Sequence, residues 1–592
     1  MIPAQAPYDQ ADLLQQLRAV VGARGLLTRP RAMKPYCTGF RTGAGSALAV
    51  LLPATLVEMW RALKICAEAN AIVIMQAANT GLTGGSTPDG DDYDRDVILI
   101  NPMRIDTILL LEGGAQVVCL PGATLYTLEA LLRPLGREPH SVIGSSCIGA
   151  SVIGGVCNNS GGALVQRGPA YTEYALFAQR GADGALRLVN HLGITLPDDP
   201  EDMLRALENG AFGADAISRD DRDAAWDQDY GRRVRDIEAA TPARYNADPE
   251  RLHEASGCAG KLAIFAVRLN SFPRPRRTGV FHIGTNRPDT LTRIRRDMLS
   301  GFAHLPVAGE YLHRACFDIA ETYGKDMFLA IRLLGTDRLP ALFRAKANID
   351  AAASRIGLKP GFSDRWMQRL GRLFPRHLPP RMTEFRDRFD HHLLLRMADD
   401  GIEEAARYLA DLFPDADGDF FLCDAEEGEK AFLHRFVAAG AAVRYRAVHG
   451  DRVEDIVALD VALPRNSRDW VETLPAALSG QTVATLYYGH FFCHVFHQDY
   501  ILRKGSDPLA FEHAMWKELD ARNARYPAEH NVGHLYRADA AMLDFYRALD
   551  PTNSFNPGIG QASKCRDWAM TIADRHGGAE GSAPPPRPHR RQ

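Results

Sequence analysis

Short apolar runs separated by polar turns dominate the N-terminal part of the chain. Leu48–Leu52 and Ala71–Met75 have the composition of buried strands. Between them, apolar side chains recur at the spacing of one helix face, at Leu56, Met59, Trp60, Leu63 and Cys66. This pattern predicts a strand–helix–strand unit over residues 48–75.

The apolar pattern continues with further strands and then a helix. Val97–Ile100, Ile105–Leu111 and Gln116–Leu120 are strand-like, and Gly113-Gly114 predicts a hairpin turn between the last two. Leucines at helical spacing then predict a helix that ends at Gly136, and they are Leu125, Leu128, Leu131, Leu132 and Leu135.

Two glycine-rich segments interrupt this pattern. Gln76–Ser86 directly follows the run Ala71–Met75, and Gly144–Gly162 is dense in Gly, Ser and Asn. Glycine lets the backbone approach a ligand closely, and successive N–H groups in a turn form an anion site. A plain surface loop is the alternative for Gln76–Ser86 taken alone. This segment lacks a lysine after its glycines and a G-x-G-x-x-G motif, which excludes a Walker A loop and the usual dinucleotide fingerprint.

Composition and charge narrow the class of protein. A chain of 592 residues is long enough for several domains, on the order of two to four. The net charge of −4, from 69 basic and 73 acidic residues, does not predict nucleic-acid binding by the whole surface. Ten cysteines without a C-x-x-C pair indicate reduced thiols. We expect no signal peptide at Met1–Gln5 and no transmembrane helix, because no apolar stretch approaches the length of about 18 residues that spanning requires.

The glycine-rich segments resemble those of a known flavoprotein family. Gln76–Ser86, the P-G-x(5)-L-x(3)-L-x(3)-G pattern from Pro121 to Gly136, and Gly154–Gly162 are together similar to the FAD domain of the vanillyl-alcohol-oxidase, or p-cresol-methylhydroxylase, family. The resemblance implies an α+β fold. It would consist of an FAD-binding domain of two α+β subdomains and a cap domain with an antiparallel sheet.

Two further segments resemble one branch of that family more specifically. Arg137–Ser151 and Gln166–Glu173 look like the bacterial respiratory, quinone-dependent D-lactate dehydrogenases. This likeness implies a peripheral protein on the cytoplasmic face of the inner membrane that oxidises D-lactate with FAD and a membrane quinone. The alternatives are an FAD-dependent dehydrogenase of another D-2-hydroxy acid, such as 2-hydroxyglutarate or glycolate, and a non-catalytic nucleotide-binding membrane scaffold.

The family resemblance also assigns cofactor contacts by position. Family members that tether their flavin use a histidine in the first loop, and none occurs between Gln76 and Pro88, so we expect FAD to be non-covalent. Asp550–Gly558 is similar to the family's C-terminal turn beside the flavin. The expected FAD-binding residues are Gln76, Ala77, Ala78, Asn79, Thr80, Gly84, Gly85, Ile143, Gly144, Ala150, Ser160, Ile264 and Asn556.

Three histidines mark the aromatic segment Leu486–Tyr500. On a helix His490, His494 and His497 would share one face, whereas on a strand His490 and His494 would share a face and His497 would not. The aromatic content favours a strand. Packed core histidines and metal or acid–base chemistry are both compatible with such a triplet.

Similarity to related 2-hydroxy-acid dehydrogenases suggests a metal site here. The spacing of His490 and His497 matches their two histidine ligands, and Glu529 matches the third ligand. A divalent metal at such a site lowers the pKa of a bound hydroxyl group. Phe491–His494 replaces the small, acidic and amide residues of those relatives, which leaves open whether this chain binds a metal.

The same relatives suggest a catalytic base. His530 follows Glu529 and corresponds to the histidine that removes the substrate hydroxyl proton, which an imidazole can do near neutral pH. The substrate carboxylate also needs a cationic partner, and Arg314 is our candidate. A structural ion pair is the alternative role for Arg314.

A basic, aromatic segment predicts the membrane contact. Lys359–Arg396 holds nine Lys and Arg against four acidic residues, with aromatic and proline residues between them. Such a segment can hold an anionic lipid surface, and the respiratory family has a basic membrane-contact segment here, at about 310–396. A solvated basic helical segment that packs by its aromatic residues is the alternative. No base-reading module accompanies it, so we expect no nucleic-acid partner.

The resemblance and the composition shifts together predict the domain order. We expect an FAD-binding domain at 1–270, a cap domain at 271–520, a return to the FAD domain at 521–574 and a disordered tail at 575–592. Residues 181–245 are charged and weakly periodic, which favours a solvated insertion or a long loop.

Overall fold

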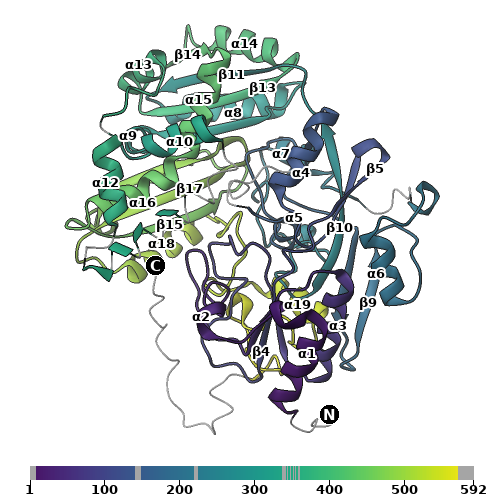
Figure 1. Ribbon diagram of the computed structural model, residues 1–592. Coiled ribbons are helices and arrows are strands. Elements are labelled where there is room, and N and C mark those ends of the chain that lie inside the picture. Colours follow the sequence, from purple (N-terminus) through teal and green to yellow (C-terminus); the bar gives the residue numbers. More distant parts are fainter. Residues whose placement is uncertain are drawn as a thin grey trace.

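The structure is a computed structural model of the chain. It describes residues 8–140, 149–218, 224–335, 361–371 and 373–570, with single residues and short stretches between 342 and 357. Two expected cofactor residues, Ile143 and Gly144, and the expected disordered tail lie outside the described residues. The N-terminal half and the C-terminal end pack into one body, and the middle of the chain forms a second (Figure 1).

The described strands form three sheets, of which the first has four strands in the order β1-β2-β4-β3. Strands β2, β4 and β3 run parallel, and helix α3 connects β2 to β3. The predicted strand–helix–strand unit is therefore confirmed. The elements of this layer are α1 (Gln10–Gly25), β1 (Leu26–Leu27), α2 (Pro30–Met33), β2 (Ala49–Leu51), α3 (Leu56–Glu68), β3 (Ile72–Met75) and β4 (Val97–Ile100).

The second sheet is antiparallel, in the order β5-β6-β10-β8-β9, and β7 pairs with β10. The predicted hairpin is confirmed, because β5 and β6 pair around a turn at Glu112–Gly114. The leucine helix is also confirmed, and Gly136 follows it with a φ of 67°. The elements of this layer are β5 (Ile108–Leu111), β6 (Gln116–Cys119), α4 (Leu125–Leu132), β7 (Arg137–Pro139), α5 (Val152–Cys157), β8 (Ala175–Arg180) and β10 (Ala263–Pro273).

The expectation of a solvated insertion at residues 181–245 is wrong for the described part of this segment. It contains strand β9 (Leu186–His191) and helices α6 (Pro200–Glu208) and α7 (Tyr230–Arg235). Leu204 and Leu207 of α6 are fully buried. The apolar residues of α6 form a packed inner face, which the high charge of the segment conceals in the sequence.

The third sheet has the strand order β14-β11-β13-β12-β16-β17-β15, and all of its pairs are antiparallel. The chain passes from β10 to β11 between Pro273 and Thr278, close to the proposed boundary at residue 270. Its strands are β11 (Thr278–Thr285), β12 (Ala308–His313), β13 (His391–Ala398), β14 (Asp419–Leu422), β15 (Val453–Ala462), β16 (Thr482–His490) and β17 (Val495–Arg503).

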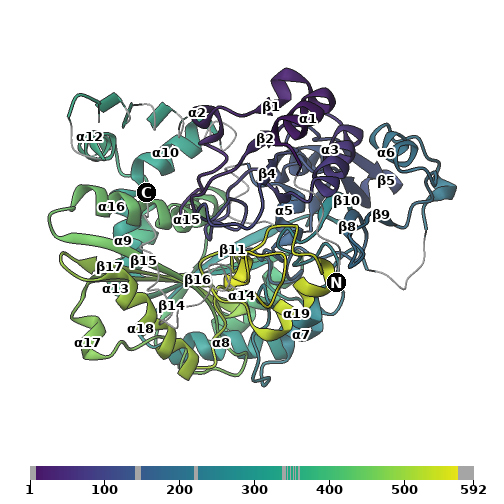
Figure 2. The same ribbon diagram turned by 90° about the horizontal axis from the view of Figure 1, so that it is seen from below.

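Helices cover both faces of this third sheet (Figures 1 and 2). On one face lie α9 (Arg314–Tyr323), α15 (Ala425–Phe436) and α16 (Ala438–Val448), and on the other lie α8 (Pro288–Gly301), α14 (Gly401–Leu412) and α18 (Pro508–Ala521). These elements confirm the expected α+β class with an antiparallel sheet. In the described part of the chain, no helix is both long and apolar enough to cross a membrane.

The C-terminal segment returns to the first sheet. After α19 (Ala540–Leu549) the chain runs beside β3, where the Val73 N–H donates to Ser554 O at 2.9 Å and the Asn556 N–H donates to Val73 O at 2.9 Å. The buried Lys261 ammonium donates to Asn553 Oδ1 at 2.8 Å and to Phe555 O at 3.0 Å. These contacts hold Asn556 next to the loop that leaves β3.

Buried histidines occupy the interior between the third sheet and its helices. The rings of His282 and His392 lie 5.4 Å apart, and the His434 ring lies 4.2 Å from that of Phe317. All three imidazoles are fully buried. Burial lowers the pKa of His282 and of His434 to about 3. The folded protein therefore keeps these side chains neutral at pH values where the unfolded chain protonates them.

We predict that these histidines make the protein acid-sensitive. Because the folded pKa lies below the unfolded value, stability is lost as the pH falls below about 6.5, by about 2 kcal/mol per histidine at pH 5. His434→Phe should therefore reduce the loss of stability between pH 7 and pH 5, measured by thermal unfolding at both values. An unchanged pH dependence in this variant would contradict the prediction.

Candidate functional site

The first glycine-rich segment turns sharply at the carboxyl end of β3. Asn79 and Gly84 have φ values of 53° and 72°, which short polar residues and glycine tolerate. The Gln76 amide donates to Tyr36 O at 2.8 Å and to Ser86 O at 2.6 Å, and the Asn79 amide donates to Thr38 O at 2.9 Å. Side chains of the segment thus fix its shape by binding main-chain carbonyls.

The second glycine-rich segment is connected to the first through Asn531. Ser151 caps α5, and Asn158 accepts a hydrogen bond from the Asn531 amide at 2.8 Å. Asn531 O in turn accepts from the Thr83 hydroxyl at 2.7 Å, so one residue links the two segments. The expected contacts Ala150, Ser160 and Ile264 lie in or beside this second segment, and Ala150 and Ile264 are buried there.

Unpartnered buried polar atoms are consistent with a polar ligand between these segments. Asn159 Oδ1 in the second segment and Asn556 Oδ1, whose amide contacts the first segment, are buried without a hydrogen-bond partner among the described residues. The Asn556 amide is oriented by Gly85 O and Ala259 O, each at 2.8 Å. Such orphaned atoms are rare in folded proteins. FAD fits this site, because its phosphates, ribityl hydroxyls and ring edges can bind to polar groups of this kind.

The histidine segment is a hairpin and not one continuous strand. β16 ends at His490, a short turn covers Phe491–Cys493, and His494 has a φ of 53° before β17 begins. The expectation that His490 and His494 share a face is therefore wrong. The turn brings the rings of His490 and His497 to 5.3 Å from one another, and His494 Nδ1 lies 3.2 Å from Pro464 O.

Glu529 joins the two histidines to form a compact cluster. One potential ligand atom from each of His490, His497 and Glu529 lies within 4.8 Å of the other two. Glu529 Oε2 is 3.3 Å from His490 Nε2 and 4.0 Å from His497 Nε2. Two imidazoles and one carboxylate are a ligand set that suits zinc and other first-row divalent metals.

Further charged groups hold this cluster in place. Glu310 Oε1 lies 2.6 Å from His490 Nδ1, and Arg435 lies 2.8 Å from Glu310 Oε2. Burial alone would lower the pKa of His490, but the Glu310 and Glu529 carboxylates raise it to about 10. Burial would raise the pKa of Glu310, but His490 and Arg435 lower it to about 2. The Arg244 guanidinium lies 2.7 Å from Glu529 Oε1.

The two expected catalytic residues lie in different places. His530 follows the cluster residue Glu529, and its Nε2 is 3.8 Å from Asp460 Oδ2, with 34% of the side chain exposed. Arg314 begins α9 and faces Asp318 at 4.0 Å and Asp390 at 3.8 Å. The structure therefore brings His530 to the cluster and directs Arg314 toward surface carboxylates.

Glu310, Arg244, Asp460 and Arg396 were not among the site residues expected from the sequence. Arg396 lies on β13 and pairs with Ala308, two residues from Glu310, so it shares a sheet face with Glu310 and His490. Its guanidinium stacks 3.9 Å from the Phe432 ring centroid, and no carboxylate of the described residues lies within ion-pair distance. Glu310, Asp460 and Arg396 are each a charged residue within an apolar strand, and this pattern could have identified them from the sequence. No local pattern identifies Arg244.

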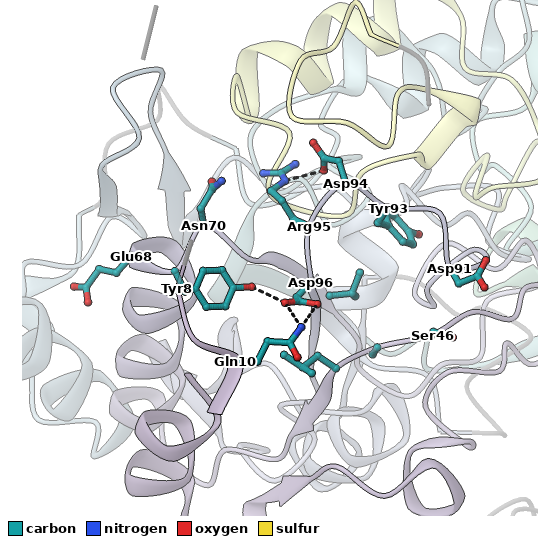
Figure 3. A pocket seen from close by; sticks show the side chains of 14 residues that line it. Tyr8, Gln10, Ser46, Glu68, Asn70, Asp91, Tyr93, Asp94, Arg95 and Asp96 are labelled. Carbon is teal, nitrogen blue, oxygen red and sulfur yellow. Dashed lines mark hydrogen bonds and ion pairs between the residues drawn. The ribbon is translucent and has the colours of Figure 1, made fainter. Parts of the chain in front are cut away.

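A separate cavity of about 770 Å³ lies away from this cluster. Leu48, Asn70 and Val97 line it where the chain enters β2, β3 and β4, whereas the first glycine-rich segment leaves the opposite end of β3. Figure 3 shows Tyr8 and Gln10 directed at Asp96 in this cavity, and both side chains donate hydrogen bonds to it. The cavity therefore lies away from the first glycine-rich segment.

Comparison with known proteins agrees with this geometry. Residues 47–173 match the family described as FAD binding domain, and residues 280–568 match D-lactate dehydrogenase, membrane binding. The quinone-dependent D-lactate dehydrogenase of Escherichia coli is 59% identical over 95% of this chain and 98% of the relative, and that of Haemophilus influenzae is 54% identical over 94% and 99%. The chain belongs to this family. FAD is therefore its cofactor, as expected.

Solved structures confirm the fold at low sequence identity. p-Cresol methylhydroxylase with bound substrate aligns over 93% of this chain and 96% of its own, with a TM-score of 0.54 and 11% identity. 4-Ethylphenol oxidase from Gulosibacter chungangensis aligns over 95% and 98%, with a TM-score of 0.55 and 12% identity. The expected p-cresol-methylhydroxylase-type architecture is thus confirmed. Bovine D-2-hydroxyglutarate dehydrogenase, by contrast, is 32% identical over only 26% of this chain.

We predict that the cluster of His490, His497 and Glu529 binds about one divalent metal per chain, because three suitable ligand atoms already converge. Metal content measured by plasma emission should fall to background in His497→Ala, with the flavin absorbance kept. His304→Ala, at an exposed histidine, is the matched control and should retain the metal. The prediction would be contradicted if wild-type protein contained no metal and its flavin were still fully reduced by substrate.

Proposed function

We propose that this chain oxidises D-lactate to pyruvate with FAD as the hydride acceptor, and that the electrons then pass to a membrane quinone. The supporting observation is that Glu529 and Asn531, two residues apart, connect the histidine cluster to both glycine-rich segments. Glu529 completes the histidine cluster and accepts from the Gly162 N–H at 3.0 Å. Asn531 contacts both glycine-rich segments.

Each group of the site has a defined task in this reaction. FAD supplies the acceptor for the hydride that leaves C2 of the substrate. His530 removes the hydroxyl proton, and the Asp460 carboxylate, whose Oδ2 lies 3.8 Å from His530 Nε2, would stabilise the imidazolium that forms. A metal held by His490, His497 and Glu529 would bind the substrate hydroxyl and lower its pKa.

The substrate carboxylate requires a cation, and Arg396 fits this role better than Arg314. Arg314 already faces two carboxylates. Arg396 has no such partner among the described residues and lies on the same sheet face as Glu310 and His490. Burial lowers the pKa of Arg396, opposed by the nearby Glu310 carboxylate. A carboxylate ligand would compensate for the burial of this guanidinium.

The proposal includes peripheral attachment to the cytoplasmic face of the inner membrane, on a surface containing anionic lipids. The match to a membrane-binding family over residues 280–568 supports membrane association. We further propose the domain order FAD-binding 1–270, cap 271–520 and C-terminal return 521–574. The change of sheet after β10 and the contacts of Asn556 with β3 support this order.

Anaerobic mixing with D- and L-lactate tests the proposed reaction. D-lactate should bleach the flavin band in a single turnover, whereas L-lactate, 2-hydroxyglutarate and glycolate should react more slowly by at least about a hundredfold. His530→Asn should keep bound FAD and lose reduction by about a hundredfold or more, because the hydroxyl proton then has no acceptor. If another hydroxy acid bleaches the flavin faster than D-lactate does, that acid is the substrate in place of D-lactate. Unchanged reduction in the variant would remove His530 from the mechanism.

Arg396→Met tests the carboxylate partner. Loss of a charge-assisted hydrogen bond should raise KM for D-lactate by about tenfold to a hundredfold, and Arg396→Lys should recover part of this loss. D-lactamide, which lacks the carboxylate charge, should be oxidised equally by wild type and variant. Arg314→Met is the matched control and should keep the wild-type KM. A raised KM in Arg314→Met alone would restore the original assignment.

A further inference from the structure

Exposed apolar side chains are concentrated in one short stretch of the described chain. Of the nineteen large apolar side chains that are exposed in the described residues, ten lie between residues 333 and 374. This stretch includes the end of α10 (Lys325–Leu334) and all of α12 (Phe362–Gly371). The ten are Leu333, Leu334, Leu342, Ile349, Ile356, Trp366, Met367, Leu370, Leu373 and Phe374. Clusters of this kind mark interaction surfaces.

Helix α12 is amphipathic, but its polar side faces the protein and its apolar side faces outward, which is the opposite of a typical surface helix. Its buried face carries Asp364, which binds Arg444 Nε at 2.7 Å, and Gln368, which donates to Thr322 O at 3.0 Å. Its outer face carries Trp366 and Leu370, which are 48% and 41% exposed. Polar anchors therefore hold the helix so that its apolar side points away from the protein.

The residues that follow α12 extend this outer face. Leu373 is 82% exposed and Phe374 is 42% exposed. The carbonyl of Phe374 accepts a hydrogen bond from Lys325 Nζ at 2.6 Å, which ties this turn to the start of α10. We call Trp366, Met367, Leu370, Leu373 and Phe374 the apolar face. Figure 2 places α10 and α12 together at one end of the molecule.

The basic residues of this segment mostly serve the fold. Arg381 pairs with Glu427, Arg386 with Glu321, and Arg388 with Asp419. Arg396 packs under Phe432, while Lys359 and Arg372 lie outside the described residues. Arg365 donates to Ala447 O at 3.4 Å. Five of the seven described basic residues counted between 359 and 396 thus contact other groups of the protein, and Arg369 and Arg376 are exposed beside the apolar face.

We propose that the apolar face inserts into the boundary between headgroups and acyl chains of a lipid bilayer. This inference rests on the proposed membrane association. It assigns the main contribution to burial of apolar side chains, whereas the sequence predicted attraction between basic residues and anionic lipid. A tryptophan among leucines, flanked by exposed arginines, matches an interfacial anchor, whose apolar side chains enter the lipid while the cations meet lipid phosphates. The family match to a membrane-binding protein favours lipid as the occupant over a second copy of the chain.

Vesicle co-sedimentation of the FAD-loaded full chain tests this insertion. Wild-type protein should bind vesicles of neutral phosphatidylcholine and stay bound in about 1 M NaCl, where the Debye length is about 3 Å. The double variant Leu370→Ser/Leu373→Ser should partition into vesicles at least about tenfold less than wild type, both at low salt and in about 1 M NaCl. Leu110→Ser, at an exposed leucine of β5, is the matched control and should bind as wild type.

A charge variant separates the two contributions. Arg369→Gln/Arg376→Gln should weaken binding only to vesicles that contain phosphatidylglycerol and only at low salt. Complete release of wild-type protein by salt, or wild-type binding by the double leucine variant, would overturn the proposal. A change of oligomeric state in the leucine variant without a change in vesicle binding would also overturn it, in favour of self-association.

Activity with a soluble electron acceptor keeps this test independent of the proposed function. All of these variants should reduce a soluble dye with D-lactate at the wild-type rate, because none of the changed residues contacts the cluster around Glu529. Failure of D-lactate to reduce the flavin would refute the proposed reaction whatever the vesicles show. If salt releases the protein from vesicles while D-lactate oxidation stays normal, apolar insertion is refuted and the proposed reaction still stands.

Discussion

The buried carboxylate of Glu529 is the interaction on which the site depends. It accepts from the Gly162 N–H, pairs with Arg244 and faces His490 and His497, while its own N–H donates to Asp460 at 2.6 Å. An isolated buried charge is costly, and removal of one partner leaves that cost uncompensated. The second glycine-rich segment, which contains Gly162, and the third sheet, which contains His490 and His497, therefore cannot separate without exposing this charge or leaving it unpaired.

This constraint explains why segments far apart in the chain must meet. Asn531, two residues after Glu529, binds the second glycine-rich segment, and its carbonyl receives the Thr83 hydroxyl of the first. Asn556 closes the same region from the C-terminal side by binding Gly85 O. The short segment from Glu529 to Asn531 thus connects both glycine-rich segments to the histidine cluster. In the proposed reaction, these few hydrogen bonds would set the distance between FAD and His530.

Local periodicity predicted the elements that depend on local order. The unit from β2 to β3, the β5–β6 hairpin and the helix α4 follow from apolar spacing and glycine turns within a few residues. The turn at 491–494 was missed because it contains no glycine or proline, and His494 adopts the left-handed conformation instead. Arg244 could not be predicted, because its role depends on a partner 285 residues away. The charged segment at 181–245 was misjudged because charge on an outer face was taken for the whole segment.

The basic segment at 359–396 shows that the sequence also cannot reveal how charged residues are used. Counting Lys and Arg gave a basic surface, but a count cannot show which of them fold against Glu427, Glu321 or Asp419. Helical spacing likewise shows that α12 has an apolar and a polar side without showing which side faces the protein. That orientation is decided by Asp364, which reaches the buried Arg444 and so turns the polar side inward. An ion pair within the protein therefore determines that apolar side chains face outward, where a lipid surface can bury them.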